Sequence, residues 1–356
     1  MRIIAHIDMD AFFAAIEERD RPYLQGLPLV IGADPEGGKG RGVVSTANYL
    51  AREYGIQSAL SIQKAWHFSE TAKKAGKPGA IFLSGNYHYY SQISSTIMNI
   101  LAKYGPIEVA SVDEAYLDLS SLNSYKAAEK TAKEIKREIK KLENLTTSIG
   151  LGPNKMIAKI ASGFKKPDGL TVISEEKVSS FLSPLSIRTI PGIGPKTEII
   201  LNKLRIQTIG DLQRLGKTEL KDLLGKWGEE LFSKVRGIDE SPVLEEYPTK
   251  SIGEQITFDK DIKDYRKLFP ILEEMVSRIW KSFLKEGFKE AARVVIIVRY
   301  ADFETKTHSR TLKTPLQSSK AFYLQALSLL MPFLDKRRNT EAKRFRLIGL
   351  RLERLS

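Results

Sequence analysis

The chain has 356 residues, of which 42% are apolar and 28% charged, a globular composition that excludes general disorder. Its 56 Lys and Arg residues outnumber its 43 Asp and Glu residues, and the net charge of +13 favours a polyanionic partner such as nucleic acid. The chain has no cysteine, which excludes disulfides, thiolate metal sites and cysteine nucleophiles.

Neither a membrane span nor a secretion signal is expected. The longest unbroken aliphatic run, Val294 to Val298, is far too short to cross a bilayer. The apolar N-terminus carries Asp8 and Asp10, which a signal peptide would not contain. We therefore expect a soluble protein of the cytoplasm.

The first half of the chain interleaves predicted strands and helices. Strands are expected at 2–10, 29–32, 43–46 and 146–151, with two more meeting inside 108–119, and helices at 11–19, 47–54, 87–104 and 125–142. The last of these helices is the clearest, because its apolar residues form one stripe while its Lys- and Glu-rich remainder is typical of a solvated face. The stripe consists of Tyr125, Ala128, Ala132, Ile135, Ile139 and Leu142.

The second half changes character twice. Residues 174–237 consist of short predicted helices punctuated by Gly and Pro, and residues 240–250, with two prolines and no periodicity, favour a linker. Residues 251–356 are predicted to form a β-α-β-β-α-β unit. This unit holds 22 basic against 13 acidic residues, or +9, whereas residues 1–250 hold 34 against 30, or +4. We therefore expect a separate, basic binding module at the C-terminal end.

Three carboxylates stand out because of where they fall. Asp8 lies at the end of the first predicted strand, and Asp113 and Glu114 are adjacent where the two strands of 108–119 meet. Adjacent acids repel unless a cation lies between them, and oxygen ligands without His or Cys suit Mg²⁺ or Mn²⁺. Two such ions, about 3.5–4 Å apart, clamp the attacking and leaving oxygens of a phosphoryl displacement. The alternative, surface acids at turns, is weakened by the apolar residues that flank both sites.

A second group of residues comes from the segment Thr46 to Arg52. Tyr49 and Arg52 are three residues apart, so they share a face if the segment is helical. A phenol and a bidentate guanidinium there suit a triphosphate, and a plain surface pair is the alternative. The glycine-rich run at 37–42 lacks the Gly-Lys-Ser/Thr ending of a P-loop, so we expect a hairpin loop instead.

A third group lies in the run from Ile190 to Lys196. Its Gly-x-Gly step, Gly192 and Gly194, separates two short predicted helices and would turn backbone N–H groups toward a phosphate. This is the helix-hairpin-helix pattern, which binds the DNA backbone without sequence preference, and Lys196 adds a cation. A plain tight turn is the alternative.

Several motifs occur together and in one order along the chain. They resemble those of the Y-family translesion DNA polymerases of the DinB type, and the resemblance runs from Ile4 to about Arg351. The motifs are DMDAFFA (8–14), TANY (46–49), SVDEAYLD (111–118), GPNK (152–155), AKIA (158–161), KPDG (166–169), PGIG (191–194) and KSIG (250–253).

The resemblance implies an α+β multidomain fold with the right-hand architecture of a polymerase. It places the palm in 1–18 and 79–173 and the small fingers in 19–78. It places a helical thumb, which contains the helix-hairpin-helix, in 174–239, followed by the linker in 240–250. The β-α-β-β-α-β unit, 251–356, becomes the little finger, a DNA-binding domain.

The resemblance also implies roles for single residues. Asp8, Asp113 and Glu114 become catalytic residues that hold two Mg²⁺ ions, or Mn²⁺, with the Met9 carbonyl as a further ligand. The incoming nucleotide is contacted by Phe13 of the first motif, by residues in and around the second motif, and by Lys166. In this set Tyr49, Arg52 and Lys166 hold the triphosphate, Phe13 is the steric gate beside the sugar, Val43, Ser45 and Ala59 roof the nascent base pair, and Thr46 lies beside them.

Partners follow from the same resemblance. Primer-template DNA would contact Gly192, Gly194 and Lys196 in the thumb and Arg346 and Arg351 in the last strand, and dNTPs would be the second substrate. Some relatives carry a basic residue at the position of Leu347, so the little-finger contacts are expected to differ. A sliding clamp is a further partner, although the chain shows no clamp-binding peptide. We expect a monomer without a segment for a proofreading exonuclease.

The sequence thus predicts a template-directed, low-fidelity DNA polymerase for translesion synthesis. In this reaction the primer 3′-OH attacks the α-phosphate of a dNTP and pyrophosphate leaves. A two-metal nuclease is a rival that would use the same carboxylates but would not need Tyr49, Arg52 and Lys166. A non-catalytic DNA-binding protein is a second rival, which the intact carboxylates disfavour.

Overall fold

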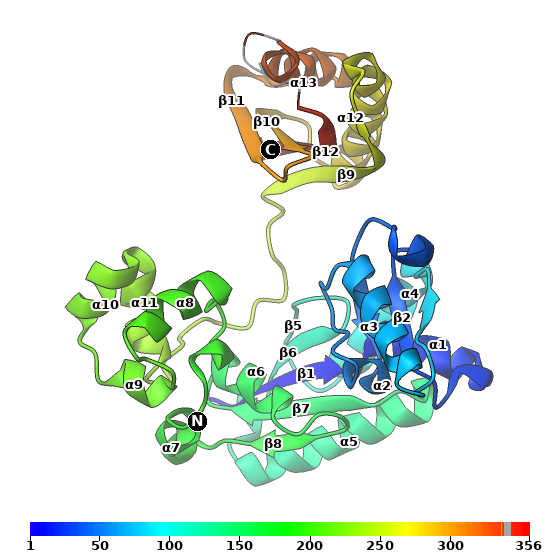
Figure 1. Cartoon of the computed structure of the whole chain (residues 1–356). Coiled ribbons are helices and arrows are strands. Elements are labelled where there is room, and N and C mark those ends of the chain that lie inside the picture. The colour runs from blue at the N-terminus through cyan, green and yellow to red at the C-terminus, as the bar shows by residue number, and fades with distance from the viewer. Residues whose placement is uncertain (336, 338–342) are drawn as a thin grey trace. The chain divides into compact units, whose positions relative to one another are not determined.

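The computed structural model describes residues 1–335, 337 and 343–356. Contacts between Cα atoms divide the chain into two units, Met1–Glu246 and Tyr247–Ser356 (Figure 1). The division falls inside the segment that the sequence predicts to be a linker. Each unit has its own hydrophobic core, so each is described by itself.

The first unit is built on a five-stranded sheet in the order β5-β6-β1-β7-β8. The central strand, β1, is antiparallel to both of its neighbours, whereas β8 is parallel to β7. Side chains alternate along a strand, so the odd-numbered residues of β1 enter the core and His6 and Asp8 lie on the opposite face. The strands are β1 (Ile4–Met9), β5 (Ile107–Val109), β6 (Glu114–Asp118), β7 (Thr147–Gly152) and β8 (Leu170–Val172).

Helices cover both faces of this sheet. The long helix α5 (Tyr125–Glu143) and α4 (Tyr87–Leu101) bury their apolar stripes against the core face, and α1 (Phe12–Asp20) follows β1 (Figure 1). On the other face, α6 (Lys155–Gly163) packs closely on β7. A Cβ at Gly150 would lie 2.1 Å from the Ala158 carbonyl oxygen, so only glycine allows this approach.

A smaller three-stranded sheet, in the order β3-β2-β4, carries the segment with Tyr49 and Arg52. Its strands are β2 (Leu29–Gly32), β3 (Val44–Ala47) and β4 (Ile81–Leu83), and its helices are α2 (Tyr49–Arg52) and α3 (Ile62–Lys74). Asn48 caps α2 by accepting the Ala51 N–H at 3.0 Å. The predicted helix at 47–54 was too long, because α2 is a single turn that ends before Gly55, at φ 84°.

Residues 174–239 form a cluster of short helices around a core that they share with α6. They are α7 (Val178–Leu182), α8 (Pro195–Lys203), α9 (Ile209–Gln213), α10 (Lys217–Leu224) and α11 (Lys226–Lys234). Gly194 is the N-cap of α8, and Pro195 occupies the first helical position, where its missing N–H costs no hydrogen bond. The sequence predicted a helix-hairpin-helix with a short helix on each side of the Gly-x-Gly step. The structure has a single 3-10 turn, Ile187–Thr189, before the step and the helix α8 after it.

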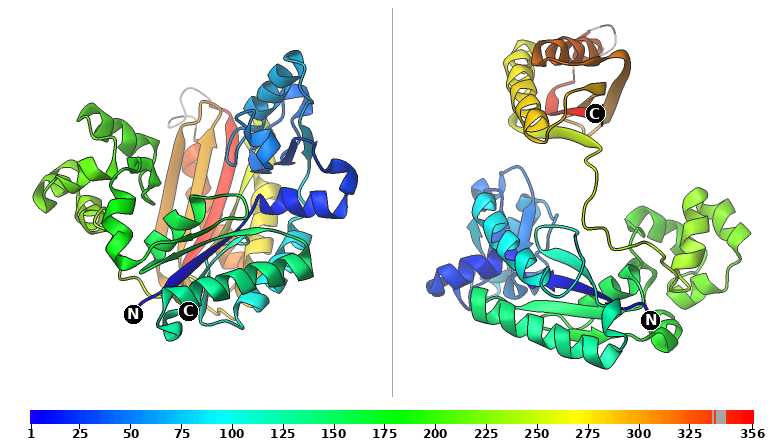
Figure 2. Two further views of the ribbon diagram at one scale, coloured as in Figure 1. Left: turned by 90° about the horizontal axis from the view of Figure 1, so that it is seen from below. Right: turned by 180° about the vertical axis from the view of Figure 1, so that it is seen from behind.

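The second unit has the predicted β-α-β-β-α-β order. It contains β9 (Ser251–Ile262), α12 (Leu268–Lys285), β10 (Ala291–Tyr300), β11 (Thr305–Leu316), α13 (Ser319–Leu334) and β12 (Phe345–Leu355). The sheet order is β11-β10-β12-β9, and every neighbouring pair is antiparallel. Both helices cover the same face of the sheet, and the other face is open within this unit (Figure 2).

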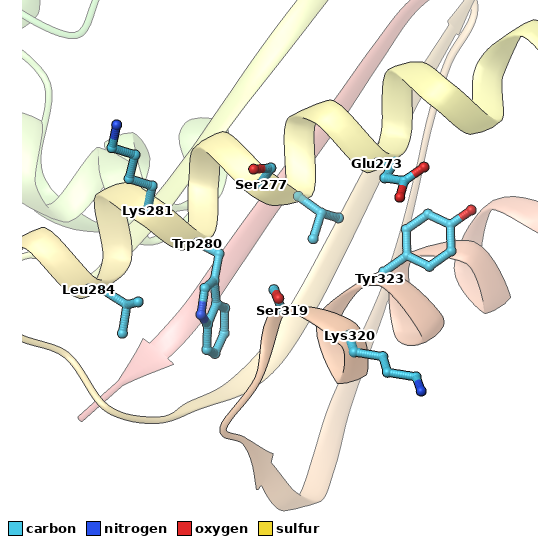
Figure 3. A pocket seen from close by; sticks show the side chains of 9 residues that line it. Glu273, Ser277, Trp280, Lys281, Leu284, Ser319, Lys320 and Tyr323 are labelled. Carbon is cyan, nitrogen blue, oxygen red and sulfur yellow. The ribbon is translucent and has the colours of Figure 1, made fainter.

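A groove of about 540 Å³ runs between α12 and α13 on the helical side of this unit. Figure 3 shows Trp280 and Leu284 entering it from α12 and Tyr323 from α13. The Trp280 ring stacks on Phe283 of the core at 4.8 Å. The groove therefore lies on the opposite side of this unit from the open face of the sheet.

No helix in the described part of the chain is long and apolar enough to span a membrane.

Candidate active site

A pocket of about 390 Å³ opens where β1, β6, the β3–α2 segment and the loop after α6 approach one another. We call it the carboxylate pocket. It gathers residues that lie up to 158 positions apart in the sequence, and most of the predicted metal and nucleotide residues line it. The lining residues are Asp8, Met9, Ala11, Phe12, Phe13, Ser45, Thr46, Arg52, Ser58, Val112, Asp113, Glu114 and Lys166.

Two of the carboxylates face each other across neighbouring strands. Asp8 of β1 pairs in register with Glu114 of β6, so both side chains lie on the face opposite to the core. Like charges directly opposite in an antiparallel pair are destabilising. The sheet therefore concentrates negative charge here, and this charge requires cations.

Lysines supply positive charge to both carboxylates. Lys166 forms an ion pair with Asp8, and Nζ of Lys159 lies 2.5 Å from Oε2 of Glu114. Burial raises the pKa of Asp8, and Lys166 opposes this shift. The His6 ring, whose Nε2 lies 3.6 Å from Oε2 of Glu114, and then Lys159 lower the pKa of Glu114 to about 2. Glu114 is therefore a carboxylate throughout the neutral range.

Asp113 is held by the turn that precedes β6. Oγ of Ser111 donates to Oδ1 of Asp113 at 2.6 Å and accepts the N–H of Glu114 at 3.0 Å. The Asp113 carbonyl accepts the Met9 N–H at 2.9 Å, which ties the turn to the end of β1. Across residues 1–335, 337 and 343–356, no three His, Cys, Asp or Glu side chains are close enough to form a metal site as they stand.

Tyr49 and Arg52 share one side of α2, as the spacing predicted. Cζ of Arg52 lies 4.9 Å from the centre of the Tyr49 ring, and Nε of Arg52 donates to the Ala47 carbonyl at 2.9 Å. Arg52 lines the pocket, whereas Tyr49 is half-buried behind it and its hydroxyl donates to Oδ1 of Asp10 at 3.3 Å. Burial, and next the Asp10 charge, raise the pKa of Tyr49, so its hydroxyl keeps its proton.

Phe13 forms an apolar wall of the pocket. Ala11, in the left-handed conformation at φ 46°, turns the chain from β1 into α1 and puts Phe13 in the first helical turn. The Phe13 ring stacks on Tyr90 at 4.6 Å and meets the edge of Tyr87 at 5.7 Å. The ring is therefore supported from behind by aromatic side chains while it borders the pocket.

The predicted roof residues are only partly gathered. Ser45 and Thr46 line the pocket, and Oγ of Ser45 lies 2.7 Å from the Tyr87 hydroxyl. Val43 is half-exposed beyond the lining, and Ala59 is exposed with φ 66° next to Ser58, which does line the pocket. The structure therefore brings together Ser45 and Thr46 but leaves Val43 and Ala59 outside the lining.

Comparisons with known proteins identify the family. The impB/mucB/samB family matches residues 7–163, its C-terminal domain matches 249–356, and a thumb domain of DNA polymerase-iota matches 188–239. DNA polymerase IV 2 of Methanosarcina mazei is 40% identical over 99% of this chain and 92% of its own length. DNA polymerase IV of Streptococcus mutans is 45% identical over 89% of this chain and 84% of its own.

The chain belongs to the Y-family DNA polymerases of the DinB type. A solved Y-family polymerase chimera, Dbh-Dpo4(243-245)-Dbh, has a TM-score of 0.86 and 31% identity over 99% of both chains. The insertion ternary complex of Dbh DNA polymerase has a TM-score of 0.67 at 31% identity, again over 99% of both chains. The predicted right-hand architecture is confirmed, and the chain is a translesion DNA polymerase.

The thumb of this polymerase exposes the predicted backbone-binding step. Gly192, at φ 102°, is exposed, and a Cβ there would meet the Trp227 ring at 3.2 Å. A Cβ at Gly194 would meet nothing within 4 Å, so its surroundings are open. Lys196 is exposed one residue into α8. The three residues lie together at the start of this helix.

The open face of the little-finger sheet carries arginines and hydroxyls. Arg351 is in register with Val295 and Gly253, and the same face holds Arg293 and Arg299. Nη2 of Arg293 donates to Oγ of Ser309 at 2.8 Å, and Nε of Arg299 donates to Oγ1 of Thr305 at 2.8 Å. We define the open face by Arg293, Arg299, Thr305, Thr307, Ser309, Thr311 and Arg351. Arg346, in contrast, lies at a bulge with Cζ 4.5 Å from the centre of the Phe303 ring.

Several residues beside the pocket were not assigned a role from the sequence. His6 and Lys159 both approach Glu114, and Asp10 contacts Tyr49. The alternation of β1 gives a signal for His6, because it shares a face with Asp8. The alternation over the strand predicted at 2–10 gives the same signal for Asp10, whereas Lys159 lies in no predicted element and gave none.

Proposed function

We propose that the carboxylate pocket is the nucleotidyl-transfer site, in which a primer 3′-OH attacks the α-phosphate of a dNTP. The observation that carries the proposal is one pocket that joins three carboxylates, two cationic side chains and an aromatic wall. A nuclease would need the carboxylates but would not need the triphosphate clamp, which we define as Tyr49, Arg52 and Lys166. A polymerase needs both sets in one place.

The donor set of the pocket fits hard divalent cations. Its ligands are the carboxylates of Asp8, Asp113 and Glu114 with the Met9 carbonyl, all oxygen atoms, which suit Mg²⁺ or Mn²⁺. Two of these carboxylates already attract ammonium groups, a sign that the site calls for positive charge. When bound, two ions would activate the attacking hydroxyl and neutralise the leaving pyrophosphate. Members of this family are metal-dependent, and two Mg²⁺ ions are our proposal for this chain.

The side chains of the pocket account for nucleotide binding. Arg52 and Lys166 would neutralise the triphosphate, with Arg52 well suited to bidentate contact. Phe13 would lie against the sugar, and Ser45 and Thr46 would lie near the base, with Val43 and Ala59 beyond them.

In the reaction a bond forms between the primer 3′ oxygen and the α-phosphorus. The bond to the pyrophosphate oxygen breaks, and the hydroxyl proton leaves.

The partners we propose are primer-template DNA and dNTPs. Gly192, Gly194 and Lys196 would contact the DNA backbone from the thumb, and Arg346 and Arg351 from the little finger, because N–H groups and cations bind phosphates. We propose that residues 1–18 and 79–173 form the palm and residues 19–78 the fingers. Residues 174–239 would form the thumb, and residues 251–356, after the linker 240–250, the little finger. We further propose a monomer that acts in the cytoplasm, with a sliding clamp as an additional partner.

A primer-extension assay with a labelled primer, dNTPs and Mg²⁺ tests this function. We expect template-directed lengthening of the primer. Shortening would indicate a nuclease instead, and an unchanged primer together with tight DNA binding would indicate a non-catalytic protein. Tyr49→Phe and Lys166→Ala should raise the KM for dNTP, since both side chains belong to the proposed triphosphate clamp.

A further inference from the structure

Asp10 follows β1 directly and its side chain is only 3% exposed. The carboxylate lies behind the pocket lining, not in it. A carboxylate is rarely buried in a protein unless several donors compensate for the lost water. The donors that surround Asp10 therefore identify the segments of the chain that this buried carboxylate holds together.

Three donors from three separate segments converge on this carboxylate. Oδ1 accepts Oγ–H of Ser148 at 2.8 Å and the Tyr49 hydroxyl at 3.3 Å, and Oδ2 accepts the Asp168 N–H at 2.8 Å. Ser148 belongs to β7, Tyr49 to α2 and Asp168 to the loop after α6. One side chain thus joins the central sheet, the small sheet and the Lys166 loop.

The contact with Tyr49 supports one arm of the proposed clamp. The Tyr49 ring lies under the guanidinium of Arg52, whose Cζ is 4.9 Å from the ring centre. Because α2 is a single helical turn, it has little rigidity of its own. The hydrogen bond to Asp10 therefore anchors the surface on which Arg52 rests.

The contact with Asp168 supports the other arm. Asp168 has φ 55°, a left-handed conformation that non-glycine residues adopt only where their surroundings hold them. Its N–H is bound by Asp10, and its carboxylate lies 2.8 Å from Nζ of Lys136. Lys166 is two residues earlier in the same loop. The hydrogen bond to Asp10 therefore helps to fix the backbone position from which the Lys166 side chain extends.

We propose that Asp10 is a positioning residue that holds Tyr49 and Lys166 in the geometry that binds the triphosphate. The proposal rests on the proposed function, because it takes the triphosphate clamp as given. Asp10 acts through these neighbours and touches neither the nucleotide nor the reacting atoms. Its loss should therefore weaken nucleotide binding more than DNA binding.

Steady-state kinetics on the full chain with a primer-template and one dNTP test this. Asp10→Ala should raise the KM for dNTP about tenfold or more, the scale of a lost hydrogen bond to a charged group. The Kd for primer-template should not change. Asp10→Asn keeps an oxygen for the Asp168 N–H and turns an amide toward the two hydroxyls, so its KM should fall between those of the wild type and Asp10→Ala.

A matched control separates positioning from loss of stability. Glu108 is also a buried carboxylate, 4% exposed, but it pairs with Lys155 outside the pocket. Glu108→Gln should lower Tm without raising the KM for dNTP. In a double-mutant cycle, Asp10→Ala and Tyr49→Phe should be non-additive in KM, because both remove the same hydrogen bond. If Asp10→Ala does not fold, Asp10→Asn carries the same tests.

Three outcomes would overturn the proposal, and the third of them is distinguishable from the first two. If Tyr49→Phe and Lys166→Ala raise KM but both Asp10 variants stay within about twofold of the wild type, Asp10 does not position the clamp. The same conclusion follows if the Asp10 variants change only Tm, or if their effect on KM is fully additive with that of Tyr49→Phe. If Tyr49→Phe and Lys166→Ala themselves leave KM unchanged, the clamp assignment fails, and the Asp10 proposal fails with it.

Discussion

The carboxylate pocket and the open face of the little-finger sheet both carry charge, but they hold it differently. In the pocket, the Asp8 and Lys166 side chains are 16% and 22% exposed and pair with each other. On the open face, the Arg293 and Arg351 side chains are 36% and 42% exposed and approach Glu353 and small hydroxyls. The Asp8 and Lys166 side chains in the pocket are therefore less exposed to water than the arginines of the sheet.

This difference indicates what each region can do. Coulomb interactions strengthen as the surroundings become less polar, so charges fixed in a partly buried pocket can select one geometry of the reacting groups. Exposed arginines beside hydroxyls suit phosphates approached from solvent, where contacts are salt-dependent and tolerant of sequence. Substitutions in the pocket should therefore change chemistry, whereas substitutions on the open face should change affinity.

The largest expected effect comes from Asp113. Asp113→Ala should lower kcat by about 100- to 1,000-fold, the scale of losing one preorganised electrostatic group. Affinity for primer-template should stay nearly unchanged, because phosphate contacts supply most of it. Primer extension and DNA-binding titrations check both. Asp118→Ala, at the other end of β6, is the matched control and should keep its activity. Near-normal extension by Asp113→Ala would remove Asp113 from the mechanism.

The next effect concerns sugar selection by Phe13. Phe13→Ala should raise ribonucleotide use relative to dNTP use by about 10- to 100-fold, since a buried hydroxyl without a partner costs roughly 1–3 kcal/mol. Competing rNTP and dNTP incorporation, measured beside Tm, checks this. Phe82→Ala removes an aromatic ring from the small sheet outside the pocket and serves as the control. An unchanged selectivity ratio with a large fall in Tm would make Phe13 an ordinary core residue.

A smaller effect is expected on the open face. Replacing Arg293, Arg299 and Arg351 together by Ala should weaken DNA binding and reduce the salt slope by about 0.7–0.9 for each lost phosphate contact. The value of kcat at saturating DNA should be unchanged. Binding titrations at several salt concentrations measure the slope. A triple variant of Lys281, Lys285 and Lys320 on the helical side removes equal charge and serves as the control. If it lost as much affinity for DNA, the open face would not be a specific DNA-binding surface.

The smallest effect concerns a hydrogen bond between Tyr104 and Glu138 in the first unit. The Tyr104 hydroxyl donates to Oε2 of Glu138 at 2.6 Å, and burial, followed by Glu138, raises the pKa of Tyr104 to about 12. The folded-state pKa lies above the ordinary value of 10.0, so this contribution to stability is complete below about pH 10 and is lost as pH rises toward 12. Tyr104→Phe should flatten the alkaline decline of Tm. A decline identical to that of the wild type would contradict this reading.

Many of the helices and strands of this polymerase follow from local sequence patterns. The stripe of α5 requires a helix over Tyr125–Glu143 that buries one side, and the β-α-β-β-α-β order of the little finger follows from periodicities and turns. The alternation of β1 also assigns Asp8 to the face opposite to the core. The helices α3 and α6 and the short strands β4 and β8 were not predicted. A strand of three residues carries too few positions for a clear period. The helix α3, in contrast, has 13 residues and buries Ile62, Ala65, Ser69 and Ala72 at helical spacing, so its period was present in the sequence and was missed.

The sequence by itself determined which residues could carry the chemistry, because a strand or helix period acts over neighbouring positions. Only the tertiary structure decided how they meet. Lys166 pairs with Asp8 across 158 residues, and Asp10 bonds to a loop equally distant, so no local pattern records either contact. Such pairs exist because the central sheet and the close packing of α6 on Gly150 bring distant segments together. The choice of partner for each buried charge is therefore a property of the folded chain.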